Sequence, residues 1–360
     1  MFQRSTARAL IKTTWAGALR ACGLLRLARQ WARRNGIIVL TLHRVLSDEE
    51  IATTASLPGM IVRRETFDQF LSYAENNLQI VDLAANISWE PRNKPAIALT
   101  FDDGWCDNAE GAFEITRKHR APMTVFIVPE RAGAAMPFWP EQAASVLGNC
   151  VSDEDSKHTY LEQVIERLKL LPEQQRDQEM EKIFSAEAAH TASATVDRTM
   201  TWGEIERLHA SGVTFGSHTC THEILTRIPP ERAEEQITHS RHEIEERLGR
   251  ECTLFAYPNG NSSPEVRGIV RRAGYKLAFV NDWPVLWTRD RDPYQVPRVN
   301  ICEYHLIGLD GKFSPLVFEY AVVWKAVRNA WVARVRGWFG QKADVTAESA
   351  EKSKAKLAAN

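Results

Sequence analysis

The sequence predicts an α/β protein whose strands run parallel, and three observations lead to this class. Short apolar runs end directly at polar side chains: residues 37–42 end at His43, residues 95–99 precede Asp102 and Asp103, and residues 213–215 precede His218. Segments with helical periodicity separate these runs. A chain of 360 residues that is 44% hydrophobic can bury a large core. Functional groups at the carboxyl ends of strands are typical of a parallel sheet or barrel.

Two adjacent carboxylates, Asp102 and Asp103, follow the strand at residues 95–99 and precede Gly104. Neighbouring residues of a strand point to opposite sides, so one acid can hold a metal while the other handles a proton. The alternative is that the acids cap the next helix. Asp107, with Glu110 three residues later, makes a plausible start for a helix that ends near residue 118 and leaves the earlier pair free.

Two histidines, His218 and His222, follow the strand at residues 213–215. Residues four apart lie on one face if the segment begins a helical turn, and imidazole pairs at this spacing suit a divalent metal. Such a pair alone is more often structural or exposed to solvent. Together with a carboxylate at an equivalent strand end it predicts an open hydrolytic site for a divalent metal. Cys220, between the histidines, is expected to face away from both.

Three segments carry a family resemblance: residues 100–104 (Thr-Phe-Asp-Asp-Gly), 218–222 (His-Thr-Cys-Thr-His) and 255–260 (Phe-Ala-Tyr-Pro-Asn-Gly). In this order they resemble the successive motifs of the polysaccharide deacetylases, carbohydrate esterase family 4. The likeness covers roughly residues 37 to 130 and 200 to 302. It implies a distorted, incomplete (β/α) barrel and a metal-dependent hydrolase that removes acetyl groups from glycans.

The resemblance also implies roles for particular residues. The divalent metal, expected to be zinc, would be bound by Asp103, His218 and His222. Asp102 would act as the base that activates water, and His43 would protonate the departing amine.

The assignment of His43 rests on residues 42–45 (Leu-His-Arg-Val), which resemble the Tyr-His-x-Val segment of one family branch, with leucine in place of tyrosine. Many members carry an arginine where this chain has Ala256. Arg298 matches the arginine of the same branch and would hold Asp102 ionised.

The turn that includes Tyr257, Asn259 and Gly260 follows a strand and is a candidate oxyanion and substrate site, because its backbone N–H groups could face the cleft. The alternative is an ordinary tight turn, which Pro-Asn-Gly favours in any context.

The chain divides into four predicted parts. Residues 1–36 form a basic amphipathic helix without acids, and residues 37–310 form the barrel with a helical insert at about 130–200. Residues 311–340 form an amphipathic, tryptophan-rich helix, and residues 341–360 form a disordered tail. At the start of the insert, Trp139 either stacks on substrate sugars or anchors the insert by burial, and burial is the favoured interpretation.

The two amphipathic ends either lie on an anionic membrane surface or pack on the barrel with a solvated basic face. Arginines interrupt the N-terminal apolar stretches too often for an export signal. A cytoplasmic protein, peripheral on the inner face of the membrane, is therefore expected. The net charge of -1 argues against nucleic-acid binding, and six cysteines without paired spacing argue against a disulfide framework.

These observations favour a metal-dependent carbohydrate deacetylase that acts on an acetylated glycan such as an exopolysaccharide, an oligosaccharide or a glycolipid, with N-acetyl groups as the expected target. Two alternatives stay open: an inactive glycan-binding or scaffold protein on the same fold, and a metal-dependent hydrolase of a non-sugar amide.

Local patterns add four expectations. Capping-box spacing predicts helix starts at Thr66 and Thr201, and residues 78–81 should form a short strand. His239 and His242, on a charged helix over residues 230–248, are expected at the surface.

Overall fold

The computed structural model describes residues 6–85, 89–135, 138–148, 154–186, 196–281 and 285–334. The expected tail at residues 341–360 lies outside the described residues.

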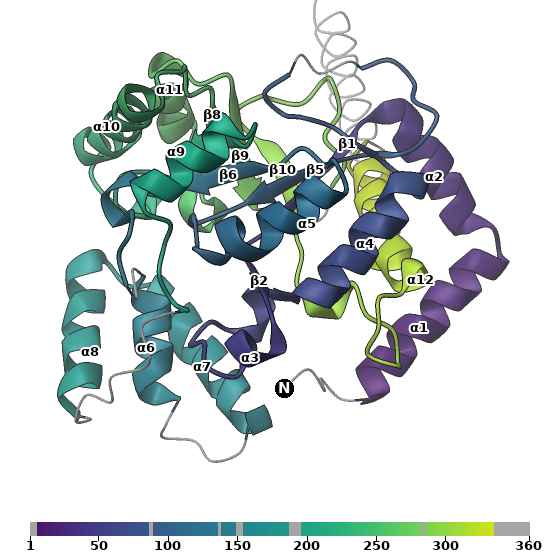
Figure 1. Ribbon diagram of the computed structural model, residues 1–360, viewed down its shortest axis with the longest axis horizontal. Coiled ribbons are helices and arrows are strands. Elements are labelled where there is room, and N and C mark those ends of the chain that lie inside the picture. The colour runs from purple at the N-terminus through teal and green to yellow at the C-terminus, as the bar shows by residue number, and fades with distance from the viewer. Residues whose placement is uncertain are drawn as a thin grey trace, which may run out of the picture.

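Seven parallel strands form a closed barrel at the centre of the molecule (Figure 1). They are β1 (Ile37–Leu42), β5 (Ala96–Phe101), β6 (Thr124–Ile127), β7 (Thr214–Ser217), β8 (Leu254–Ala256), β9 (Leu277–Asn281) and β10 (Val296–Asn300). Strand β1 closes the ring because it pairs along its whole length with β5 and also with β10. The predicted (β/α) barrel is confirmed, with seven ring strands among the described residues where a complete barrel has eight.

Alternation of side chains along the strands builds the core on both sides of the barrel wall. In β1, Ile37 and Val39 belong to the cluster that fills the barrel interior, whereas Ile38 and Leu40 belong to the cluster between the wall and the helices. All six residues of β1 are buried. The continuous apolar run therefore reflects a strand that is covered on both faces.

Three short strands lie outside the ring. Strand β4 (Gln79–Ile80), which confirms the strand expected at residues 78–81, pairs with the first residues of β5. Strands β2 (Arg44–Leu46) and β3 (Ile61–Arg63) form a small parallel sheet beyond the carboxyl end of β1.

Helices cover the outside of the ring. They are α4 (Arg64–Asn77), α5 (Phe113–Lys118), α9 (Trp202–Ala210), α10 (Pro230–Leu248) and α11 (Pro264–Arg272). Shorter helical segments are α3 (Asp48–Ile51), η1 (Pro58–Met60), η2 (Asn108–Ala112), η3 (Pro129–Arg131), η4 (Leu225–Arg227), η5 (Pro258–Gly260) and η6 (Glu303–His305). The capping box at Thr201 is confirmed, and His239 and His242 are exposed on α10.

The capping box expected at Thr66 is wrong, because α4 begins at Arg64 and Thr66 lies inside it. The Thr66 hydroxyl donates instead to the carboxylate of Glu303, at 2.6 Å. The Thr66 side chain therefore bonds to Glu303, a residue distant in sequence, instead of capping the helix as the local spacing predicted.

The helical insert consists of α6 (Trp139–Leu147), α7 (Glu154–Lys169) and α8 (Glu173–Ala186). It has a small core of its own, in which Ala143, Val164, Leu168 and Met180 are buried. Trp139 packs partly buried against this core, as the burial interpretation expected, and it also lines a cavity described below.

The expected N-terminal helix is broken into α1 (Thr6–Ala21) and α2 (Leu24–Asn35). Gly23 separates them with φ of 74°, a left-handed conformation that glycine adopts without steric cost. The two helices pack on the barrel beside the C-terminal helix, as Figure 1 shows at the right.

The C-terminal helix consists of α12 (Pro315–Phe318), the π-helical stretch η7 (Glu319–Trp324) and helical residues 325–334. Its buried face includes Phe318, Val322 and Ala326, while Trp331 is exposed. Over the described residues this helix packs against α1 and α2.

In the described part of the chain, no helix combines the length and the apolar composition that crossing a membrane requires. Among the described residues, the cysteines at 22, 106, 220, 252 and 302 form no disulfide bond. Cys220 is buried and its thiol donates to the backbone of α10, as expected for a residue that faces away from the two histidines.

Candidate metal and catalytic site

A cavity of about 430 Å³, here called the cleft, opens at the carboxyl ends of the barrel strands. It is lined by all the predicted metal ligands and by the predicted base and acid: Asp102, Asp103, His218, His222 and His43. Helices α6 and α7 of the insert form part of its wall. A larger cavity of about 640 Å³ lies at the opposite, amino ends of the strands and contains none of the predicted site residues.

The three predicted metal ligands converge. Asp103 Oδ1 lies 3.4 Å from His222 Nε2 and 3.7 Å from His218 Nε2. One ligand atom from each of these residues lies within 4.8 Å of the other two. Zinc ligand atoms at about 2.0–2.2 Å from the ion would be roughly 3.4 Å apart in a tetrahedral site. The spacing of the three groups fits such an ion.

The loop after β7 places the histidines, and it does so without the helical turn that the four-residue spacing suggested. Thr219 and His222 both have left-handed backbone conformations, with φ of 67° and 70°. The Thr219 hydroxyl accepts the backbone N–H of His222 and fixes the loop. The expectation that the histidines meet was right, but the helical reason given for it was wrong.

Hydrogen bonds orient the ligands. Nδ1 of His218 donates to the backbone carbonyl of Ala256 at 2.8 Å, which leaves its Nε2 lone pair free to bind a metal. Asp103 has φ of 71° and directs one carboxylate oxygen to the histidines, while the other accepts the indole N–H of Trp105 at 3.1 Å.

Burial keeps both imidazoles neutral. It lowers the pKa of His218 and of His222 to about 4, although nearby Asp102 acts in the opposite direction. Neutral imidazole is the form that binds a metal. Two neutral histidines and one carboxylate therefore form a donor set that suits zinc at neutral pH.

Asp102 lies beside this group and is bound by Arg298, as expected. The guanidinium donates to both carboxylate oxygens, at 2.6 and 2.7 Å, and both side chains are buried. Burial by itself would raise the pKa of Asp102, but the charge of Arg298, with a smaller effect of His218, lowers it to about 2. Asp102 is thus ionised throughout the physiological range.

His43 follows the last residue of β1 and lines the cleft. Asn108 donates its side-chain N–H to the backbone carbonyl of His43, at 2.9 Å. Nδ1 of the imidazole is buried without a hydrogen-bond partner in the structure. His43 is therefore held by its backbone, and its ring is free to engage a group that enters the cleft.

The turn at residues 257–260 contributes less to the cleft than expected. The Tyr257 side chain is buried away from it and donates to the backbone of Tyr294. The backbone N–H groups of Tyr257 and Gly260 donate to carbonyls of Phe279 and of Tyr257 itself. Asn259, with φ of 56°, is the residue of this turn that lines the cleft.

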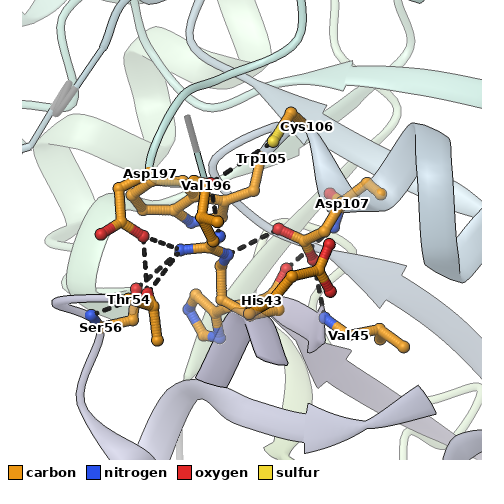
Figure 2. Close-up of polar contacts among 12 residues, drawn as sticks. His43, Val45, Thr54, Ser56, Trp105, Cys106, Asp107, Val196 and Asp197 are labelled. Carbon is orange, nitrogen blue, oxygen red and sulfur yellow. Dashed lines mark hydrogen bonds and ion pairs between the residues drawn. The ribbon is translucent and has the colours of Figure 1, made fainter. Parts of the chain in front are cut away.

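Sequence reasoning missed a buried polar network around Arg44, the residue after His43. The guanidinium is fully buried and binds Asp107 at 2.6 Å and Asp197 at 2.8 Å, and it also contacts Thr54, Ser56 and the carbonyl of Val196 (Figure 2). The two carboxylates outweigh burial and raise the pKa of Arg44 above its usual value.

This network supports the metal ligands. The Arg44 guanidinium lies 4.2 Å from the ring centre of Trp105, whose indole binds Asp103. A helix does begin at Asp107 and run to Lys118 through η2 and α5, as expected, but the Asp107 carboxylate accepts from Arg44 and from the backbone N–H of Val45 and makes no side-chain cap. Arg44 and its two carboxylate partners, Asp107 and Asp197, lie far apart in the sequence, so no local pattern predicts that they meet.

Three further residues of the cleft also escaped sequence reasoning. Glu141, on α6, is buried, and burial together with the charge of Asp103 raises its pKa to about 8, so it faces the cleft as a neutral acid at pH 7. Asn281 and Asn300, the last residues of β9 and β10, line the wall beside Asn259. The position of these two asparagines at the carboxyl ends of strands is the sequence feature that could have identified them as cleft residues.

Comparisons with known proteins agree with the fold. The family model described as polysaccharide deacetylase matches residues 90–278, more than half of the chain. The chain is 18% identical to YxkH of Bacillus subtilis (strain 168), a curated protein named as a polysaccharide deacetylase, over 67% of this chain and 65% of that protein. The chain thus spans about two thirds of the length of this relative.

Solved structures show the same fold. IcaB from Ammonifex degensii has a TM-score of 0.51 at 20% identity and covers 81% of this chain and 98% of its own. A polysaccharide deacetylase from Bacillus cereus has a TM-score of 0.51 at 16% identity, covering 77% and 67%. A de-N-acetylase from Aggregatibacter actinomycetemcomitans has a TM-score of 0.50 at 13% identity, covering 79% and 99%.

The closed parallel barrel carries a carboxylate and two histidines at one end, and this set of side chains could hold a metal ion. With the family model matched over more than half of its length, the chain belongs to the polysaccharide deacetylase family.

Proposed function

We propose that this protein is a metal-dependent hydrolase that removes acetyl groups, most of all N-acetyl groups, from a polysaccharide, an oligosaccharide or a glycolipid. One observation carries the proposal. A carboxylate held ionised by Arg298 lies beside the convergent Asp103, His218 and His222 in a single cleft. Membership of the family supports the reaction class, and the name of the similar de-N-acetylase favours the N-acetyl group.

The residues around the cleft divide the work of amide hydrolysis. A zinc ion bound by Asp103, His218 and His222 would supply Lewis-acid polarisation of the acetyl carbonyl. Asp102 takes a proton from the attacking water as its oxygen bonds to the carbonyl carbon. His43 gives a proton to the sugar nitrogen as the C–N bond breaks. Acetate and a free amine leave.

The test is acetate release from N-acetylglucosamine oligomers by the zinc-loaded protein. We expect activity in the wild type and loss of about 10³-fold or more in Asp102→Asn, which removes the base but keeps the shape of the side chain. Metal content, measured by elemental analysis, should survive in Asp102→Asn and fall in His218→Ala. Activity retained in Asp102→Asn would contradict the assignment of the base.

The same assay separates the two other candidate functions. An inactive glycan-binding protein would bind the oligomers without releasing acetate. A hydrolase of non-sugar amides would release acetate from small N-acetyl compounds and leave the oligomers intact. The presence of Arg298 on Asp102 favours an active enzyme, because it supplies the partner that Ala256 cannot.

A further inference from the structure

Helix α1 carries apolar side chains on the face that it turns away from the barrel. Lys12 and Ala16 are buried on the inner face. Leu10, Ile11 and Trp15 are 54%, 58% and 60% exposed. Ile11 and Trp15 are four residues apart and therefore lie side by side on the outer face of the helix, and Leu10 is exposed next to Ile11 in the chain. Isolated exposed apolar residues are common, but a large aromatic and two large aliphatic residues gathered on one surface indicate a binding face.

Exposed cations lie further along the same pair of helices, at the end of α1 and on α2. Residues 1–47 contain no Asp or Glu. Arg20, Arg26 and Arg34 are exposed, and within the described residues none of the three forms an ion pair with a carboxylate. By contrast, Lys12 and Arg29 are used inside the protein, where they bind backbone carbonyls after β10 and the carboxylate of Glu319.

A groove beside α2 gathers part of this charge. It has a volume of about 560 Å³ and is lined by the arginines at 20, 26, 29 and 33 together with uncharged residues and Glu319. An anionic phosphate group would find several guanidinium donors there. An anionic lipid surface binds this combination of side chains. Exposed apolar side chains enter the acyl boundary, and arginines without a carboxylate partner bind the anionic headgroups.

We infer that the outer face of α1 and the exposed arginines of α1 and α2 dock this protein on the surface of an anionic phospholipid bilayer. The face would lie in the plane of the headgroups, with Leu10, Ile11 and Trp15 in the acyl boundary and Arg20 and Arg26 on phosphates. This is peripheral binding, in which no segment crosses the bilayer.

The position of α1 gives this surface a consequence for the cleft. The Lys12 ammonium group donates to the backbone carbonyl of Tyr304, at 2.6 Å, in the segment that follows β10 and the cleft residue Asn300. Figure 1 shows α1 at the lower right and the insert helices at the lower left, on the same lower side of the molecule but at opposite ends of its long axis. A docked protein would open its cleft beside the bilayer, within reach of a lipid-carried glycan. This consequence rests on the proposed function, whereas the docking does not.

Vesicle flotation of the full chain tests the docking without using activity. We expect binding to vesicles of mixed phosphatidylcholine and phosphatidylglycerol, and at least about tenfold weaker binding to pure phosphatidylcholine. Arg20→Ala together with Arg26→Ala should weaken binding by about 30-fold, from about 1 kcal/mol for each arginine near an anionic surface. Trp15→Gln should also weaken it.

Matched controls come from exposed residues elsewhere. Arg207→Ala on α9 and Leu170→Gln after α7 should leave flotation unchanged. Circular dichroism checks that each variant is folded. Absence of binding, equal binding to both vesicles, or binding that ignores the α1 and α2 variants would overturn the inference. A soluble dimer that Trp15→Gln dissociates, without flotation, would identify the face as a contact between two copies and would also overturn it.

Discussion

Arg298 determines the charge of the residue on which the proposed chemistry depends. Asp102 is buried, and a buried carboxyl without a partner would hold its proton. The bidentate guanidinium reverses this and lowers the pKa of Asp102 to about 2. Because this pKa is lower in the folded than in the unfolded protein, the ion pair stabilises the fold at every pH above about 3.9, the ordinary pKa of an aspartate. This stabilisation is lost as the pH falls through about 2.

Replacing Arg298 should therefore move the pH dependence of catalysis. Arg298→Met leaves Asp102 buried without its cation, so its pKa should rise and the acid limb of kcat/KM should shift to higher pH. We expect a loss of stability of about 3–5 kcal/mol, as is typical when one partner of a buried pair is removed. Arg298→Lys keeps the charge and should shift the limb less.

The measurement is kcat/KM against pH for both variants, with urea unfolding for stability. An acid limb that stays at the wild-type pH in Arg298→Met would show that Arg298 does not control Asp102. The exposed Arg207→Ala is the matched control and should change neither quantity.

At the scale of elements, Arg44 joins parts of the chain that no local pattern connects. It lies on β2 and binds Asp107 before η2 and Asp197 after the insert. Backbone bonds between residues 104–106 and 198–200 continue the same contact. These contacts hold the end of the insert against the strand end that carries Asp103, the proposed metal ligand.

Arg44→Met should destabilise the protein by about 3–5 kcal/mol, because it leaves two carboxylates buried without a cation. Adding Asp107→Asn and Asp197→Asn to Arg44→Met removes those charges and should recover part of the loss. Urea unfolding of the three proteins, with zinc affinity as a second measurement, tests this. A triple variant less stable than Arg44→Met would show that the ion pairs are not the source of the effect.

Local sequence patterns predicted helix caps correctly where the capping partner is close in sequence. They failed where a residue distant in sequence binds the capping side chain instead. Thr201 and Glu204 form the capping box that their spacing predicts, because both partners lie within one helical turn. Thr66 and Asp107 fit cap patterns equally well, yet Glu303 and Arg44 take their side chains. A single sequence contains no signal that ranks these competing partners.

At the scale of the whole molecule, the motifs predicted the barrel and the convergence of the metal ligands, because strand ends meet at one rim of a parallel barrel. Closure by β1 between β5 and β10 was not derivable from periodicity, since it depends on which strands pair. The burial of Glu141 in the cleft was also not predictable from the sequence. It depends on how the insert packs against the barrel in three dimensions.

Metal binding should stabilise the whole molecule, because the ligands join the ends of β5 and β7. For a ligand that binds only the folded state, a thousandfold excess over its Kd adds about 4 kcal/mol. Zinc should therefore raise Tm, and a chelator should reverse the increase. His222→Ala, which removes one ligand, should abolish most of it, and the exposed His239→Ala should not.

The pH dependence of this stabilisation tests the buried state of the histidines. The pKa of His218 and His222 is lowered to about 4 in the folded protein, against about 6.5 when unfolded. Without metal, the unfolded state binds more protons between these values, so stability should fall as pH falls from about 6.5 to about 4. In the folded protein both rings stay neutral in that range, so zinc does not compete with protons for them. The zinc-dependent increase in Tm should thus stay nearly constant from about pH 7.5 to 5.5 by differential scanning calorimetry, whereas a steep fall below about 6.5 would show ordinary, accessible histidines.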